Sequence, residues 1–198
     1  MHTIVFFGDS ITQQGNSGNG FIAQLRQQLS ATDYQLIGAG IGGNKVYDLY
    51  LRLERDVLLL EPDTTVILIG INDIWHKEKG IGVDIVKYEQ FYRAIIEKLL
   101  QHQSKVILCT LTVIGERTNQ SNPMDADLEA YSQVVTTLAS DYQITCVALR
   151  QIFTQYLQIH NTTNAYKGIL TTDGVHLNTI GNTLVATALL PLLQQLSN

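Results

Sequence analysis

The stretch TIVFFGDS at residues 3–10 is the most informative part of the chain for predicting its fold. Its first five residues are apolar or β-branched, which predicts a buried strand. Gly8 and Asp9 end this run, and a helical pattern follows Ser10. Because ligands bind beyond the carboxyl ends of strands in open α/β sheets, Ser10 would stand where a nucleophile is useful. Asp and Ser also close turns and cap helices, so this stretch alone leaves a purely structural role open.

Short apolar runs alternate with longer helical segments along the whole chain. The strand candidates are residues 3–7, 34–37, 65–69, 105–110 and 144–148. Apolar residues recur at helical spacing within residues 21–29, 46–57, 88–99, 128–142 and 180–192. Strands this apolar belong in a parallel sheet that is covered on both faces. We therefore predict one domain, residues 1–198, built as a three-layer α/β/α sandwich around a flavodoxin-like, five-stranded parallel sheet of order 2-1-3-4-5.

Several local signals predict where the later helices begin and end. Asp125 and Asn178 precede apolar helical patterns and are typical N-cap residues. Pro191 is expected to kink or end the last helix. The stretch 150–171 is interpreted as a long connection that leads back over the sheet toward Ser10.

The composition is typical of a soluble globular domain, with 45% hydrophobic and 16% charged residues. A formal charge of −5, without a stripe of Lys or Arg, argues against nucleic acid as a partner. No apolar run approaches the length of a membrane span. Cys109 and Cys146 lie in apolar strand-like runs, which suggests buried thiols, although a disulfide between them stays open. No basic and apolar leader precedes the first strand, so we expect a cytoplasmic protein.

The glycine-rich segment at residues 38–43 has two interpretations. Its sequence, GAGIGG, satisfies the G-x-G-x-x-G pattern of dinucleotide-binding domains, which makes such a domain the alternative function. That pattern needs an acidic residue at the end of the following strand, whereas Asp63 precedes the third strand. Glycines also allow a backbone N–H to approach a ligand closely, which suits an oxyanion site equally well.

Two further segments place polar groups at the same predicted edge of the sheet. Asn72 and Asp73 follow the third strand, the expected neighbour of the first. Asp173 precedes His176 by three positions, so one tight turn can set the carboxylate against the imidazole, as in a base that activates a serine. Taken one at a time, the Asn-Asp pair is also typical of an Asx turn, and the D-x-x-H spacing is common by chance.

Together, in this order along the chain, these blocks resemble the SGNH (GDSL) hydrolase family, and the resemblance extends from end to end. It implies that Ser10 is the nucleophile and that Asp173 and His176 complete a catalytic triad. It also implies an oxyanion hole made by the backbone N–H of Ser10, the backbone N–H of Gly43 and the side-chain amide of Asn72. The expected reaction is acyl transfer from a carboxylic ester to water, with no cofactor and no metal.

Two departures from the family pattern affect how these blocks are aligned. A glycine, Gly38, stands where the second block often begins with asparagine, and Leu177 follows the histidine where proline is frequent. Neither change removes a catalytic atom, but the first leaves Gly42 as a second candidate for the oxyanion donor. We interpret Asp9 and Asp73 as residues that fix loops.

The expected substrate is a small ester. The loops predicted to border the cleft, residues 74–82, 112–124 and 159–170, are mostly polar and include the aromatic residues Trp75 and Tyr166. No extended apolar lid is present in the sequence, which favours a short-chain or polar acyl ester, such as an acetylated sugar, over a bulk lipid. The family resemblance leaves lysophospholipids and thioesters open as substrates.

Overall fold

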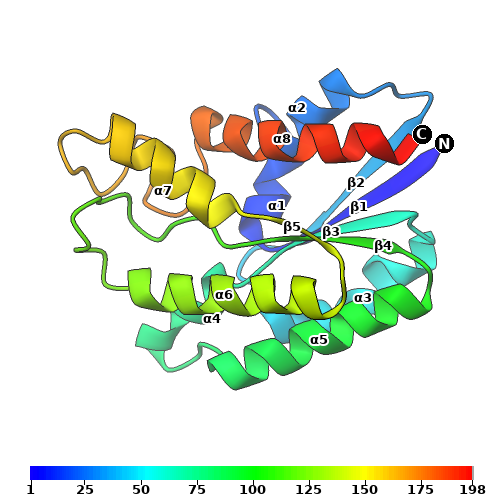
Figure 1. The fold of residues 1–198 in the computed structure, drawn as a ribbon, viewed down its shortest axis with the longest axis horizontal. Helices are drawn as coiled ribbons and strands as arrows, with labels where there is room; N and C mark the ends of the chain where they lie inside the picture. Colours follow the sequence, from blue (N-terminus) through cyan, green and yellow to red (C-terminus); the bar gives the residue numbers. More distant parts are fainter. Residues whose placement is uncertain (198) are drawn as a thin grey trace.

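The computed structural model describes residues 1–197 and places five parallel strands in one sheet. The strands are β1 (His2–Gly8), β2 (Tyr34–Gly40), β3 (Thr64–Leu68), β4 (Lys105–Cys109) and β5 (Thr145–Val147). Their order across the sheet is β2-β1-β3-β4-β5, and every neighbouring pair is parallel. The predicted strand order is therefore confirmed, and the switch point lies beside β1 (Figure 1).

Helices cover both faces of this sheet, which confirms the three-layer α/β fold (Figure 1). One layer contains α3 (Val46–Asp56), α5 (Ile85–Gln101) and α6 (Asp125–Asp141). The opposite layer contains α1 (Ser10–Gly15), α2 (Phe21–Gln28), α7 (Leu149–His160) and α8 (Thr179–Gln194). The short elements are η1 (Leu58–Leu60), α4 (Ile71–Trp75), η2 (His76–Lys79) and η3 (Gln195–Ser197).

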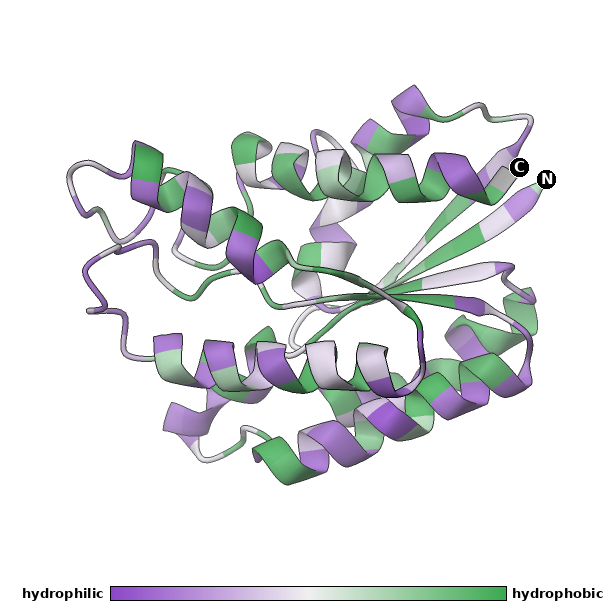
Figure 2. Cartoon of the chain, in the orientation of Figure 1, coloured by the Kyte–Doolittle hydropathy of each residue, from purple (hydrophilic) through white to green (hydrophobic). Residues whose placement is uncertain are grey.

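The core lies between the sheet and these two layers of helices. Residues 4–8 of β1 and all of the neighbouring strand β3 are buried, as expected for strands with helices on both faces. Figure 2 shows the consequence: the strands are mostly hydrophobic, and the helices alternate between hydrophobic and hydrophilic residues. Burial on both faces is what makes the strand sequences continuously apolar.

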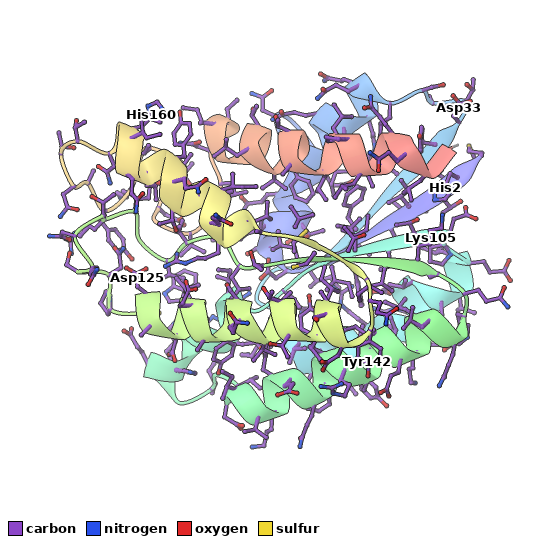
Figure 3. All side chains as sticks on the ribbon, viewed as in Figure 1. His2, Asp33, Lys105, Asp125, Tyr142 and His160 are labelled. Atoms are coloured by element: carbon purple, nitrogen blue, oxygen red, sulfur yellow. The ribbon has the colours of Figure 1, made fainter. Side chains whose placement is uncertain are left out.

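The two ends of the sheet differ in position and in content. His2 and Lys105 mark the end where the strands begin, and Asp125 and His160 mark the region beyond the carboxyl ends (Figure 3). The second region collects the segments that follow each strand, including the start of α1 at Ser10. The sequence blocks of interest all lead to this end of the molecule.

The structure corrects three local predictions. Residues 149–160 form α7, so the first half of the predicted long connection at 150–171 is helical. The N-cap of α6 is Met124, and Asp125 occupies the first helical turn, where its charge complements the helix dipole. Of the two effects expected at Pro191, a kink or an end of the helix, the structure excludes the second, because α8 continues to Gln194. Asn178 is the N-cap of α8 as predicted, because its side chain accepts a hydrogen bond from the N–H of Gly181.

Cys109 and Cys146 are both free thiols, so the disulfide that the sequence left open is not formed. Burial raises the pKa of both thiols. Within residues 1–197, no helix is long and apolar enough to cross a membrane.

Candidate active site

Ser10 is the first residue of α1, directly beyond the carboxyl end of β1. Asp9 is the N-cap of this helix, and its carboxylate accepts a hydrogen bond of 2.9 Å from the N–H of Ile11. The strand pairs with both β2 and β3, so Ser10 follows a central strand at the switch point of the sheet. The serine is only partly buried, which leaves its hydroxyl open to a partner from another segment.

That partner is His176, which lies 166 positions away in the sequence. Its Nε2 is 3.0 Å from the Oγ of Ser10, and its Nδ1 is 2.7 Å from the Oδ2 of Asp173. The three side chains therefore form one hydrogen-bonded chain from carboxylate to imidazole to hydroxyl. The structure brings together the three residues that the sequence singled out.

Asp173 is fixed by the turn that contains it. Its Oδ1 accepts hydrogen bonds from the backbone N–H groups of Val175 and His176, at 2.9 and 2.8 Å. Partial burial opposes ionisation of this carboxyl, but its hydrogen bonds with the His176 side chain and with these two N–H groups outweigh that effect and lower its pKa. A carboxylate that stays ionised beside an imidazole stabilises the imidazolium cation.

The turn closes on itself at its base. Thr171 and Leu177 form an antiparallel bridge, and the N–H of Thr172 donates to the carbonyl of His176 at 2.8 Å. Gly174, inside the turn, has a φ of +104°, a conformation that favours glycine. This compact turn carries Asp173 and His176 on one rigid unit.

Two neighbouring N–H groups of the glycine segment differ in their hydrogen bonding. The N–H of Gly42 donates to the Oε1 of Gln13 at 2.9 Å. Gly43 has a φ of +78°, and within residues 1–197 its N–H donates no hydrogen bond. Of the two candidates that the sequence left, Gly43 is thus the one with a free donor.

Asn72 lies in α4, just beyond β3, and is buried. Its Nδ2 donates to the carbonyl of Asn44 at 3.1 Å and lies 3.5 Å from the Oδ2 of Asp9. The contact with Asn44 orients the amide, and the second contact is at the limit of a hydrogen bond. The N–H of Ser10 is a helix N-terminal donor, which has no partner within its own helix. Three donors thus belong to segments that follow three neighbouring strands.

Two buried carboxyls, Asp9 and Asp73, lie behind this edge of the sheet. Burial raises the pKa of each to about 7, and the charge of Asp9 contributes to the shift of Asp73. The Oδ1 of Asp73 accepts from the N–H of Val46 at the start of α3. The Asp9 side chain therefore caps α1, and the Asp73 side chain ties α4 to the start of α3.

Two aromatic side chains border the turn with His176. The ring of Trp75 lies edge-to-face with the imidazole of His176, with 6.4 Å between the ring centres. Tyr166 packs against Gly174, since a Cβ atom at that glycine would come within 2.6 Å of the tyrosine ring. Both residues come from the loops that the sequence predicted to border the cleft.

The dinucleotide-binding alternative does not fit the observed use of the glycines. Gly38 and Gly40 lie inside β2, and a Cβ atom on Gly40 would come within 2.2 Å of the backbone nitrogen of Gln13. These glycines therefore allow β2 to approach α1 closely. Asp63 accepts from the N–H of Thr3, at the end of the sheet where strands begin. Asp63 thus lies at the opposite end of the strands from residues 38–43 and cannot hold a ribose bound there.

The sequence reasoning missed Glu116, which follows the buried segment after β4. Its side chain is fully buried and binds the backbone of residues 169–171, just before the turn with Asp173. The available signal was a single acidic residue directly after the apolar run from Leu111 to Gly115.

Comparisons with known proteins agree with this geometry. A model of the GDSL-like lipase/acylhydrolase family matches residues 6–184. An acetylxylan esterase of Geobacillus stearothermophilus is 30% identical over 209 residues, which cover 94% of this chain and 91% of that enzyme.

Solved structures give the same result. The crystal structure of an acetyl xylan esterase, AlAXEase, superposes with a TM-score of 0.93 at 46% identity and covers 96% of this chain and 98% of that one. An acetylxylan esterase structure from Geobacillus stearothermophilus has a TM-score of 0.82 at 27% identity, with 96% and 93% covered. Solved variants of that enzyme described as catalytic mutants replace a serine, an aspartate, and a histidine three positions after the aspartate. The chain therefore belongs to the GDSL-like lipase/acylhydrolase family and is a hydrolase that acts on ester bonds.

Proposed function

We propose that Ser10, His176 and Asp173 are the catalytic triad of a serine esterase. The observation that carries this proposal is the continuous hydrogen-bonded chain from Asp173 Oδ2 through the imidazole to Ser10 Oγ, with distances of 2.7 and 3.0 Å. The replaced serine, aspartate and histidine in the catalytic mutants of the related acetylxylan esterase support the same assignment.

In the proposed reaction, His176 removes the proton of Ser10 as Oγ attacks the ester carbonyl. The ionised Asp173 holds the imidazole in the required tautomer and stabilises the cation that forms. His176 then protonates the leaving alcohol as the carbon–oxygen bond breaks. Water enters next, loses a proton to His176 and attacks the acyl group. The bond from the acyl carbon to Oγ then breaks, His176 returns the proton to Oγ, and the acid leaves.

The negative charge that develops on the carbonyl oxygen needs donors that are already in place. We assign this role to the backbone N–H of Ser10, the backbone N–H of Gly43 and the amide of Asn72. The free N–H of Gly43 supports its choice over Gly42, whose N–H is bonded to Gln13. The carbonyl of Asn44 orients the amide of Asn72. The 3.5 Å contact between Asn72 Nδ2 and Asp9 is weak, so this N–H can donate to an oxyanion instead.

We further propose that the substrate is a short-chain ester of a polar alcohol, with an acetylated sugar as the favoured class. The acetylxylan esterases among the related proteins support this choice. The loops at the site support it as well, because residues 115–122 are rich in polar side chains. Bulk lipid, nucleic acid and a bound cofactor have no role in this proposal.

We also propose that residues 1–198 form a single domain and that the protein is cytoplasmic. One continuous hydrophobic core that extends from Ile4 to Leu193 supports the first statement. The free thiols of Cys109 and Cys146 support the second, because reducing compartments keep thiols unpaired.

A fluorophosphonate probe tests the nucleophile directly. We expect single labelling of the protein, at Ser10, and no labelling of the Ser10→Ala variant. Labelling at another residue, or undiminished labelling of Ser10→Ala, would remove the basis of the proposed triad. The p-nitrophenyl esters of increasing acyl length, followed by acetylated xylo-oligosaccharides, then test the substrate class. Faster turnover of long-chain esters than of the acetyl ester would contradict the short-chain proposal.

A further inference from the structure

A buried carboxylate, Glu116, lies beside the turn that carries Asp173 and His176. Glu116 follows the buried segment after β4, residues 110–115, and its side chain is fully buried. An ionisable group in such a place needs partners, since burying an unpaired carboxylate is costly. The partners show what the residue holds.

Four donors converge on this carboxylate. Its Oε2 accepts from the N–H of Ile169 at 2.7 Å. Its Oε1 accepts from the N–H groups of Leu170 and Thr171, at 2.8 and 2.5 Å, and from the Oγ1 of Thr171 at 2.6 Å. All four donors are neutral, and within residues 1–197 no basic side chain forms a salt bridge with Glu116. The carboxylate therefore acts on the backbone of residues 169–171 and on no counter-ion.

The backbone around Glu116 holds the same region from a second direction. The N–H of Gly115 donates to the carbonyl of Gly174, and the N–H of Glu116 donates to the carbonyl of Tyr166, each at 2.8 Å. The carbonyl of Glu116 accepts from Asn161 Nδ2 at 2.6 Å. Residues 115–116 thus contact the loop on both sides of residues 169–171.

These contacts reach the site through Thr171. Its Oγ1 donates to Glu116 and accepts from the N–H of Gly174 at 3.0 Å. Thr171 also pairs with Leu177 in the bridge that closes the turn. Asp173 and His176 lie within that turn, so Glu116 is bonded to the residue at its base.

From this geometry we infer that Glu116 is a positioning residue for the Asp173–His176 pair. Its carboxylate fixes the backbone of residues 169–171 and thereby the distance between the imidazole and Ser10. The inference rests on the proposed function of these three residues. It goes beyond that function because it assigns catalytic alignment to a side chain from the segment after β4.

Two substitutions at this position remove different numbers of contacts. Glu116→Gln keeps the size of the side chain, but its amide NH₂ must face at least one backbone N–H, so donors oppose each other. Glu116→Ala removes all four hydrogen bonds. We expect kcat for p-nitrophenyl acetate to fall about tenfold in Glu116→Gln and about 10²-fold in Glu116→Ala, because a small displacement of reacting groups is costly. KM should change by less than about threefold, because the substrate contacts remain.

A spectroscopic measurement separates alignment from general destabilisation. The proton between His176 Nδ1 and Asp173 Oδ2, in a 2.7 Å hydrogen bond, should give a far-downfield NMR resonance in the native protein. We expect this resonance to broaden or disappear in both Glu116 variants. The matched control is Val106→Ala, which creates a cavity at a buried position of β4 near the opposite end of the sheet. This variant should have a lower Tm, but its kcat and its resonance should be unchanged.

The outcomes distinguish the inference from the proposed function. If folded Glu116→Gln retains the resonance and native kcat, Glu116 has no positioning role. The same conclusion follows if Val106→Ala loses kcat to the same extent at an equal fall in Tm. If Glu116→Ala does not fold, the kcat and the resonance of Glu116→Gln and Thr171→Val test the inference instead. Thr171→Val removes the hydroxyl that joins Glu116 to Gly174. If the native protein shows no Ser10-dependent hydrolysis, the proposed function fails, and the resonance still reports whether Glu116 holds Asp173 against His176.

Discussion

The side of the site that carries the proposed nucleophile and the side that carries the proposed base, called here the nucleophile side and the base side, are held by different kinds of structure. Ser10 stands between a buried central strand and the helix that begins with it, and its neighbour Asp9 caps that helix locally. His176 stands on a turn that contains no strand or helix and that is held by side-chain and backbone bonds from the segment after β4. The comparison teaches that the end of a strand and a local helix cap hold the proposed nucleophile, whereas contacts with a segment distant in the sequence hold the turn that carries the proposed base.

The carboxyl groups on the two sides have pKa values that are shifted in opposite directions. Asp9 and Asp73, behind the nucleophile, are fully buried, and burial raises the pKa of each to about 7. Asp173, on the base side, is partly open to water, and its hydrogen bonds lower its pKa despite partial burial. The same residue type is thus suited to a structural contact on one side and to a lasting negative charge on the other.

The largest expected effect comes from breaking either side outright. Ser10→Ala and His176→Ala should each lower kcat by about 10⁴-fold or more, because the hydroxyl is a weak nucleophile without its base. The double variant should be hardly slower than either single one, since residues that act as a unit are not additive. Steady-state kinetics with p-nitrophenyl acetate on folded variants measure this. Additive losses would show that the two sides do not act as a unit.

A smaller loss is expected at Asn72, the proposed oxyanion donor on the nucleophile side. Asn72→Ala should lower kcat by about 10²–10³-fold with little change in KM, because the amide acts mainly on charge in the transition state. Two backbone N–H groups would remain. The kinetics need a thermal transition as a control, since Asn72 is buried and also bonds Asn44. Full kcat in a folded Asn72→Ala protein would return this residue to the role of closing a turn.

Two glycines on the base side offer a matched pair. Gly168 and Gly174 have similar φ values, +101° and +104°, but a Cβ atom at Gly174 would come within 2.6 Å of Tyr166, whereas one at Gly168 has open space. Both alanine variants should lose about 1–3 kcal/mol of stability through backbone strain. Only Gly174→Ala should also lower kcat, by a few-fold to about tenfold, because it displaces the turn with His176. Equal kinetics in the two variants would show that the turn tolerates displacement.

The smallest effect on activity is expected for Asp73→Asn, and its signature is the pH dependence of stability. The pKa of Asp73 rises from 3.8 to about 7 on folding, so the folded protein holds a proton that the unfolded chain releases. This group's contribution is therefore complete below about pH 4, declines as the pH rises toward 7, and is constant above that.

The Asn variant lacks this titration. The free energy of unfolding of Asp73→Asn minus that of the native protein should therefore increase between pH 5 and 7, by at most about 1.4 kcal/mol per pH unit. Urea unfolding at pH 5, 6, 7 and 8 measures the difference, with Asp33→Asn, an exposed position far from the site, as the control. A difference that does not vary with pH would show that Asp73 is ionised throughout.

The sequence predicted the fold well because each signal was local and repeated. Five apolar runs gave five strands, and the glycine, aspartate and asparagine residues at their ends marked where chemistry could gather. The errors lay where a local signal was weak. The helix α7 has polar residues between its buried positions Phe153 and Leu157 and follows a strand of only three residues, so it was taken for a connection. Pro191 did not end α8, whose buried face continues to Leu193.

For the site, the motif residues could be named from the sequence, but their support could not. Ser10 and His176 meet through the packing of residues 161–178, and within that stretch Glu116 binds the backbone of residues 169–171. A lone glutamate after a strand has no spacing signature, because its partners are backbone N–H groups, which every residue possesses. The choice between Gly42 and Gly43 depended likewise on a contact with Gln13 that no motif records.

The sequence by itself determined the parallel sheet, the order of its strands and the polar blocks at their carboxyl ends, because apolar periodicity and connection handedness restrict how such a chain can fold. Only the tertiary structure decided which groups meet. A hydrogen bond between residues 166 positions apart, a carboxylate that holds three successive backbone groups, and a pKa raised by burial all depend on distances and on exclusion of water. Those quantities exist only once the chain is folded, because no residue carries them alone.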